Sequence, residues 1–206
     1  MKWDYEFDVV VIGSGNGALT SALCSHDGGA KTLVIEKSTQ FGGTSATSGG
    51  GVWIPNNRYA KAENVDDSDQ DARNYINSVS PAGKIKDELI ETYLSEGPKM
   101  VDYLHENSQV KYRNLAHYPD YFPDNPGGKA GNRSMEPEPI NGTILGDDLG
   151  RLREQHPQTA FTMGPINMNF TQVEGQLLLG ALPGWKTQFA KLFTQYIFCL
   201  LYTSPS

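Results

Sequence analysis

The sequence predicts an α/β fold built on one βαβ unit near the N-terminus, with further helices after it. The run Val9 to Ile12 is β-branched throughout and ends at a glycine, which is typical of a strand buried on both faces of a parallel sheet. A second run of this kind spans 32–35, and apolar residues at helical spacing lie between the two. Strand, helix and strand in succession form a right-handed crossover, as in Rossmann-like folds.

Other elements follow from local signals. Gly28 and Gly29 are expected to end the first helix, and Ser68 is expected to cap a helix that closes at Ser80. A helix around 89–94 is expected to break at Gly97-Pro98, where the proline suits the first turn of another helix. Prolines and glycines are dense from 118 to 139 and predict little regular structure there, while 185–196 reads as an amphipathic helix.

Composition narrows the possible partners and compartment. The chain has 206 residues and a formal net charge of −7, which argues against nucleic acid or an anionic membrane as a partner. Two cysteines without a C-x-x-C pair exclude a disulfide framework and favour a reducing, cytoplasmic setting. The polar N-terminus and the lack of an apolar run of about 20 residues predict neither a signal peptide nor a membrane span. Four scattered histidines give no metal-ligand spacing, so no metal is expected.

The turn after the first strand carries a dinucleotide fingerprint, Gly13-x-Gly15-x-x-Ala18. Gly13 permits the tight turn, Gly15 lets the backbone approach a pyrophosphate, and Ala18 allows the helix to pack on the strand. Glu36 ends the second strand, where a carboxylate binds ribose hydroxyls and repels a 2′-phosphate. NADP is thereby disfavoured, but NAD and FAD both remain possible on these residues alone.

A third segment separates the two cofactors. Residues 41–51 read FGGTSATSGGG and offer several hydroxyls and unhindered backbone N–H groups directly after the second strand. A flexible linker is the plainer interpretation of this composition, but the close apolar flanks at Ile35 and Val52-Trp53-Ile54 favour a packed loop. Such a loop suits a flat ring system and a long phosphate chain, which favours FAD.

The segments DVVVIGSGNGALTSAL and VIEKSTQFGGTSATSGGGVWIPNN together resemble the flavoprotein family of fumarate reductases and 3-ketosteroid Δ1-dehydrogenases. The GVWIPNN extension is closest to the ketosteroid dehydrogenases. Looser similarity continues through YPDY at 118–121 and through PGG and GNRS at 126–134. The resemblance implies FAD as cofactor, an oxidoreductase of steroid metabolism, and a small-molecule substrate and an electron acceptor as partners. The FAD is expected to be non-covalent, because no histidine or cysteine lies in 41–51.

The resemblance also assigns site residues. FAD contacts fall on Gly13, Ser14, Gly15, Asn16, Gly17, Ala18, Glu36, Lys37, Gly43, Thr44, Ser45, Ser48, Gly49 and Gly50. Tyr121 falls at the position of a catalytic tyrosine, and Tyr118 and Gly51 fall on the substrate pocket. The family chemistry moves a hydride from steroid C1 to flavin N5 while a tyrosine takes a C2 proton, which the 3-keto group acidifies.

The resemblance gives a domain layout and leaves alternatives open. Residues 1–197 are expected to be the N-terminal part of an FAD-binding domain, with a βαβ core at 7–36 and a flavin loop at 41–51, incomplete relative to the family. Residues 198–206 are expected to be a non-native tail, and the chain alone is expected to be inactive, because the assisting tyrosines of the family lie further along. The alternatives are a fumarate-reductase-like flavoprotein, although 118–126 offers no Arg or His clamp, and an FAD-binding fragment without turnover.

Overall fold

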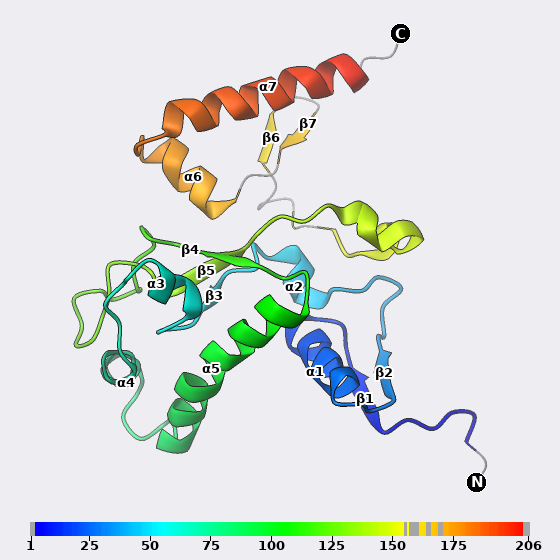
Figure 1. The fold of residues 1–206 in the computed structure, drawn as a ribbon, viewed down its shortest axis with the longest axis vertical. Coiled ribbons are helices and arrows are strands. Elements are labelled where there is room, and N and C mark those ends of the chain that lie inside the picture. The colour runs from blue at the N-terminus through cyan, green and yellow to red at the C-terminus, as the bar shows by residue number, and fades with distance from the viewer. Residues whose placement is uncertain (1–2, 155, 157–160, 164–165, 169–170, 204–206) are drawn as a thin grey trace. The chain divides into compact units, whose positions relative to one another are not determined.

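The computed structural model describes residues 3–154, 156, 161–163, 166–168 and 171–203 (Figure 1). The chain divides into two compact units. Unit 1 comprises Met1–Gly50 and Ile140–Phe161, and unit 2 comprises Gly51–Pro139 and Thr162–Ser206. The expected tail at 198–206 lies outside the described residues from 204 onward.

Unit 1 contains the predicted βαβ unit. Strand β1 (Val9–Ile12), helix α1 (Asn16–Asp27) and strand β2 (Thr32–Ile35) follow one another, and the strands pair in parallel with Val9 opposite Thr32. Helix α1 ends at Gly28, whose N–H donates to the Cys24 carbonyl at 3.0 Å. Strand, turn, helix and stop signal are therefore confirmed. Unit 1 also holds helix α2 (Gly43–Thr47) and the 3₁₀ segment η1 (Gly142–Arg151).

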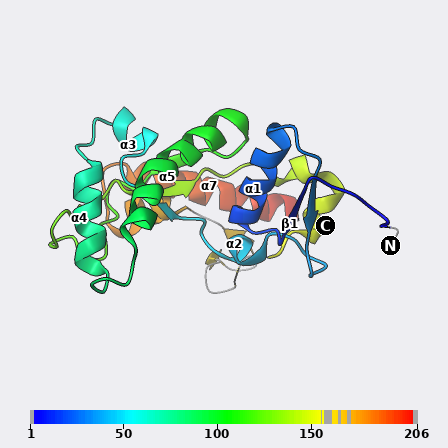
Figure 2. The same cartoon turned by 90° about the horizontal axis from the view of Figure 1, so that it is seen from below.

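The expected burial of β1 on both faces is wrong for this chain. Along β1 the side chains alternate between half-buried and exposed, and Ile12 is 82% exposed. Helix α1 packs against both strands, and Figure 2 shows it lying alongside β1. Within the described part of unit 1 one face of the strand pair is covered by a helix and the other carries exposed apolar side chains.

Unit 2 centres on a three-stranded antiparallel sheet in the order β3-β5-β4. These strands are Val52–Trp53, Ser134–Pro137 and Tyr112–Asn114, respectively. The prediction of irregular structure across 118–139 is therefore wrong for β5. This segment has no alternating apolar pattern of its own, and its extended form depends on pairing with a neighbour on each side.

Three helices accompany this sheet: α3 (Arg58–Ala62), α4 (Asp69–Val79) and α5 (Asp87–Asn107). The predicted Ser68 cap is confirmed, because its Oγ accepts from the Asp71 N–H at 3.0 Å. The predicted break at Pro98 is wrong, because α5 runs through it. Buried residues flank the proline on both sides, including Leu94 and Val101, and their packing offsets the backbone hydrogen bond that proline removes.

The C-terminal part contains strands β6 (Phe161–Met163) and β7 (Ile166–Met168), which pair, and helices α6 (Gln172–Leu179) and α7 (Trp185–Thr203). Helix α6 begins with a capping box between Thr171 and Glu174. Helix α7 confirms the helix predicted at 185–196, and two residues of its predicted apolar face, Phe189 and Phe193, are exposed. Among the helices that the structure describes, none has the length and apolar character needed to cross a bilayer.

Candidate functional site

The glycine fingerprint forms a sharp corner between β1 and α1. Gly13 adopts a φ of +96°, a left-handed conformation that glycine takes without strain, and its N–H donates to the Ile35 carbonyl at 2.7 Å. Gly15, the N-cap of α1, has no side chain that could accept from the first turn, and the first N–H of that turn, on Asn16, donates to the Ser45 side chain. This is the arrangement that binds phosphate at a helix N-terminus.

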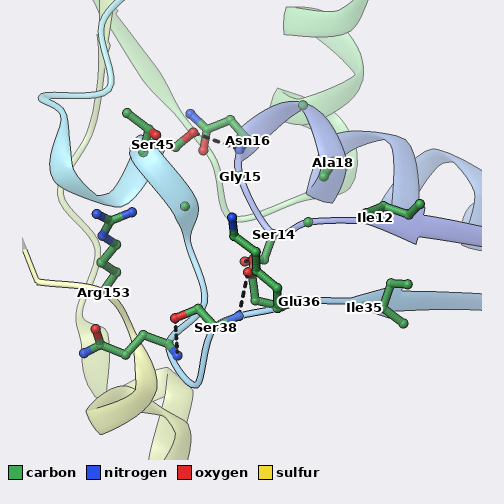
Figure 3. A pocket seen from close by; sticks show the side chains of 16 residues that line it. Ile12, Ser14, Gly15, Asn16, Ala18, Ile35, Glu36, Ser38, Ser45 and Arg153 are labelled. Carbon is green, nitrogen blue, oxygen red and sulfur yellow. Dashed lines mark hydrogen bonds between the residues drawn. The ribbon is translucent and has the colours of Figure 1, made fainter.

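Ser14 connects the three predicted cofactor segments. Its side chain is buried, and its Oγ donates to Glu36 Oε2 at 2.5 Å while accepting from the Gly42 N–H at 2.9 Å. One hydroxyl therefore holds the fingerprint, the acidic residue after β2 and the start of α2 in register. Figure 3 shows Ser14 and Glu36 side by side, just beyond the ends of β1 and β2.

The Glu36 carboxylate is held in its charged form. The hydrogen bond from the Ser14 hydroxyl, followed by the bond from the Ser38 N–H to Oε1 at 3.0 Å, lowers the pKa of Glu36 below its ordinary value. The carboxylate is consequently ionised over a wider pH range than a free glutamate. Its remaining acceptor capacity suits a pair of ribose hydroxyls.

Helix α2 borders the corner from the glycine-rich loop. Its N-cap, Gly42, has a φ of +105°, and a Cβ there would lie 2.7 Å from the Ala46 Cβ. Ser45 Oγ accepts from the Asn16 N–H at 3.0 Å, and a Cβ on Gly15 would lie 3.4 Å from the same oxygen. The loop is therefore packed on the fingerprint, as expected, and does not behave as a free linker.

These segments surround a cleft of about 780 Å³ in unit 1. Its predicted lining residues are Gly13, Ser14, Gly15, Asn16, Gly17, Ala18, Glu36, Lys37, Gly43, Thr44 and Ser45. The other predicted cofactor residues, Ser48, Gly49 and Gly50, follow the end of α2 and are not among the lining residues.

Sequence reasoning missed several lining residues: Ile12, Ile35, Ser38, Gln40 and Arg153. Ile12, Ile35 and Ser38 adjoin predicted residues in sequence, and Gln40 precedes the predicted loop at 41–51. Proximity to Glu36 is the signal that would have found Ser38. Arg153 has no local signal. It enters because Phe41 and Leu152 form a parallel bridge that brings the segment after η1 beside the cleft.

The lining fits the diphosphate and ribose portions of FAD. Nothing lies within 4 Å of the place where a Gly13 Cβ would be, and the same holds for Gly17, so the backbone at the corner is open to a ligand. Main-chain N–H groups, hydroxyls and the Glu36 carboxylate converge there. Among the described residues no group of three or more His, Cys, Asp or Glu side chains could hold a metal ion.

The predicted substrate residues belong to unit 2, whereas the cleft is lined by unit 1 alone. Tyr121 is 86% exposed, Tyr118 is half-buried, and the Tyr118 N–H donates to the Leu115 carbonyl at 3.2 Å. Gly51 is exposed at the start of the unit. The roles of these residues remain predictions.

A buried ionic cluster supports the YPDY segment and was not predicted. Asp120 accepts from Trp53 Nε1 at 2.7 Å and from Arg133 Nη1 at 2.9 Å. Arg133 Nη2 pairs with Asp67 at 2.7 Å, and the guanidinium lies over the rings of Trp53 and Tyr75. Every charge in the cluster is almost fully buried and has a partner, so the segment that carries Tyr118 and Tyr121 is anchored at its centre.

Comparison with known proteins agrees with this geometry. A family model described as an FAD binding domain matches residues 8–186. A 3-oxosteroid 1-dehydrogenase of Mycolicibacterium smegmatis is 38% identical over 168 residues, which is 82% of this chain and 29% of that protein. A 4-oxocyclohexanecarboxylate 2-dehydrogenase of Sinomonas cyclohexanicum is 39% identical over 76% of this chain and 27% of its own length.

A solved structure is also similar. It is the crystal structure of a 3-ketosteroid Δ1-dehydrogenase from Sterolibacterium denitrificans in complex with 1,4-androstadiene-3,17-dione. The TM-score is 0.82 at 38% sequence identity, over 97% of this chain and 35% of that chain. The present chain thus spans about a third or less of the length of the relatives it matches. Because the family model covers most of the sequence, the chain belongs to the FAD binding domain family.

Proposed function

We propose that the protein takes part in the FAD-dependent 1,2-dehydrogenation of a 3-ketosteroid or a similar cyclic ketone. The observation that carries this proposal is the 38–39% identity to dehydrogenases whose names specify a ring ketone as substrate, over about four fifths of the chain. The cleft in unit 1 supports it, because its groups suit the nucleotide half of FAD.

In this proposal the chain binds FAD without a covalent bond. The corner at Gly13 and Gly15 receives the diphosphate, and Glu36 binds the adenosine ribose. Gly43 and Ser45 extend the lining from α2, and Ser48, Gly49 and Gly50 continue it toward the flavin ring. FAD, when bound, supplies an acceptor for the hydride that leaves the substrate. The non-covalent mode is supported by residues 41–51, which contain no histidine or cysteine.

Tyr121 is proposed to remove the proton from the carbon next to the ketone, and Tyr118 and Gly51 are proposed to line the substrate pocket. The unperturbed phenol pKa of about 10 means that Tyr121 requires assistance as a base. What supports the assignment is placement: Tyr121 is exposed and follows Asp120, which the buried cluster fixes. The segment thus offers an exposed phenol on an anchored backbone.

We also propose a domain layout, a cellular location and an electron acceptor. Residues 1–197 are taken as the N-terminal part of an FAD-binding domain and 198–206 as a non-native tail. A cytoplasmic location is supported by the cysteine usage, and a separate electron acceptor by the redox chemistry. A fumarate-type reaction is less well supported, because the relatives above act on cyclic ketones by name. An FAD-binding chain without turnover is the remaining alternative.

The test has a binding arm and a catalytic arm. The 206-residue chain, refolded with FAD, is expected to show a flavin absorbance band that acid precipitation releases into the supernatant. For catalysis, residues 1–186 replace the matching segment of the Mycolicibacterium smegmatis relative, and 4-androstene-3,17-dione is assayed with an artificial electron acceptor. The chain alone is expected to show little or no turnover, whereas the chimera is expected to be active.

Tyr121→Phe in the chimera should lower kcat by about 100-fold or more, the usual range for losing a general base. Tyr5→Phe is the matched control, because Tyr5 is similarly exposed at 81%. FAD content measured for each variant separates a lost base from a lost cofactor. A chimera that holds FAD and turns over equally with Tyr121→Phe would refute the assigned role.

A further inference from the structure

Arg153 enters the cleft from a segment far from the glycine-rich motifs. The Phe41 N–H donates to the Arg151 carbonyl at 2.9 Å, and the Arg153 N–H donates to the Phe41 carbonyl at 2.9 Å. Two backbone hydrogen bonds therefore fix the chain on either side of Leu152. Figure 3 shows the Arg153 side chain extending along α2, across the cleft from Ile12 and Ile35.

Arg151 and Arg153 differ in their acidic neighbours. Arg151 pairs with Asp148 at 2.8 Å, on the exposed face of η1. No acidic side chain in the described ranges forms an ion pair with Arg153, although it lines a cleft that also contains Glu36. The planar guanidinium offers N–H donors in a geometry that matches phosphate oxygens two at a time.

The N-terminus of α1 is a second feature of the cleft that favours binding of an anion. The N-cap of α1 is a glycine, so the N-cap side chain contributes no acceptor, and Ser45 Oγ accepts from the Asn16 N–H. Nothing lies within 4 Å of the place where a Cβ on Gly13 or Gly17 would be. A helix N-terminus and an arginine that line one cleft from different segments both attract negative charge. The acidic Glu36 is engaged by Ser14 and the Ser38 N–H, so it does not occupy Arg153.

We propose that Arg153 is a cofactor-binding residue whose guanidinium pairs with the diphosphate of FAD. The proposal rests on the placement of FAD in this cleft given under the proposed function. It adds a cation supplied by the segment after residue 140 to a site otherwise built from residues 12–45. The binding energy of the diphosphate then depends on both stretches of chain that make up unit 1.

The experiment compares two probes that differ by the diphosphate alone. ADP and adenosine are titrated by calorimetry into the 206-residue chain and into Arg153→Gln, Arg153→Lys and Arg151→Gln. Arg153→Gln should weaken ADP by about tenfold or more while adenosine stays within about twofold, because a charge-assisted hydrogen bond is lost only with the diphosphate. Arg153→Lys should keep part of the affinity, and Arg151→Gln should match the original chain.

Three results would overturn the proposal. ADP affinity unchanged in Arg153→Gln would place the guanidinium outside the site while leaving FAD in the cleft. Equal losses for ADP and adenosine, with a lowered melting temperature, would make the role purely structural. An original chain that binds neither ADP nor FAD, while melting cooperatively, would contradict the placement of FAD itself.

A further expected result concerns ionic strength. Arg153→Gln should make ADP binding less dependent on salt concentration, because one charge contact is lost.

Discussion

The indole Nε1 of Trp53 donates a hydrogen bond to Oδ1 of Asp120 at 2.7 Å, joining β3 to the YPDY segment. The other carboxylate oxygen, Oδ2, accepts from Arg133 Nη1 at 2.9 Å and from the Lys129 N–H at 3.0 Å. Both carboxylate oxygens of Asp120 therefore accept hydrogen bonds, and the Arg133 guanidinium compensates its charge inside the unit. The segment between Tyr118 and Tyr121 is held from its middle residue.

Replacing Arg133 should unfold unit 2 more easily. Arg133→Gln leaves the carboxylates of Asp67 and Asp120 buried without a counter-charge, so the free energy of unfolding should fall by about 3–5 kcal/mol. Urea denaturation followed by tryptophan fluorescence measures the change in a Trp3→Phe, Trp185→Phe background, where the signal comes from Trp53 beside the guanidinium.

The control for this change is Arg58→Gln. Arg58 also bridges two carboxylates, those of Asp102 and Glu106, but all three side chains are partly exposed. The loss there should stay below about 1 kcal/mol. Equal effects of the two substitutions would show that burial of the Arg133 cluster has no energetic weight.

Removing the Ser14 hydroxyl should raise the pH at which nucleotide binding is lost on acidification. The Ser14 and Ser38 donors lower the pKa of Glu36, so binding that needs its carboxylate persists above that depressed pKa and is lost as the pH falls through it. Ser14→Ala raises this pKa toward its ordinary value, and adenosine affinity should then decline at a higher pH. Titrations across the acidic range give the midpoint.

Ser38→Ala serves as the comparison, because the group that Ser38 offers to Glu36 is its backbone N–H at 3.0 Å, which alanine retains. The pH midpoint of adenosine binding for Ser38→Ala should equal that of the unaltered chain. A Ser14→Ala midpoint at the same or lower pH would contradict the assignment of the Ser14 hydroxyl as the main cause of the depressed pKa.

Glu36→Gln should change which adenosine compounds bind. In the proposed site the carboxylate accepts from ribose hydroxyls and repels a 2′-phosphate, whereas an amide does neither as strongly. Adenosine affinity should fall by roughly tenfold, and the preference for 5′-AMP over adenosine 2′,5′-bisphosphate should shrink. The same substitution at Glu88, an exposed residue of α5, should leave both affinities unchanged. An undiminished preference would mean that Glu36 faces away from the sugar.

Gly42, at the N-cap of α2, and Gly17, in the cleft, should respond oppositely to alanine. Gly42→Ala puts a Cβ 2.7 Å from the Ala46 Cβ at a φ of +105°, so the unfolding free energy should fall by about 1–3 kcal/mol. Gly17→Ala meets open space at the start of α1 and should raise it by about 0.5–1 kcal/mol. Thermal melts monitored by circular dichroism test both, and a stabilising Gly42→Ala would disprove the close packing of α2.

The part of the fold that could be predicted from sequence is the part fixed by neighbours in sequence. The β-branched strands, the stop at Gly28 and the Ser68 cap depend on a few adjacent residues, and the structure reproduces them. The break expected at Pro98 fails because residues of α5 on both sides of the proline are buried against other elements. That burial is a tertiary effect, and local propensity does not contain it.

The same distinction applies to the site. Gly13, Glu36 and Ser45 could be identified because each motif carries its own chemistry in consecutive residues. Arg153 and the Arg133 cluster could not, because their partners are separated by long stretches of sequence and lie together only after folding. A buried arginine surrounded by acids leaves no periodic trace in the sequence.

Unit 1 is discontinuous, since residues 51–139 lie between its two stretches of chain. The bridge from Phe41 to Leu152 thus closes a long loop, whose entropic cost rises only slowly with length, by about 0.6 kcal/mol per doubling. During translation the turn at Gly13 and Gly15 is synthesised early, and Arg153, which lines the same cleft, is synthesised late. A nascent chain consequently presents an incomplete cleft until residues 51–139 and then Arg153 have emerged.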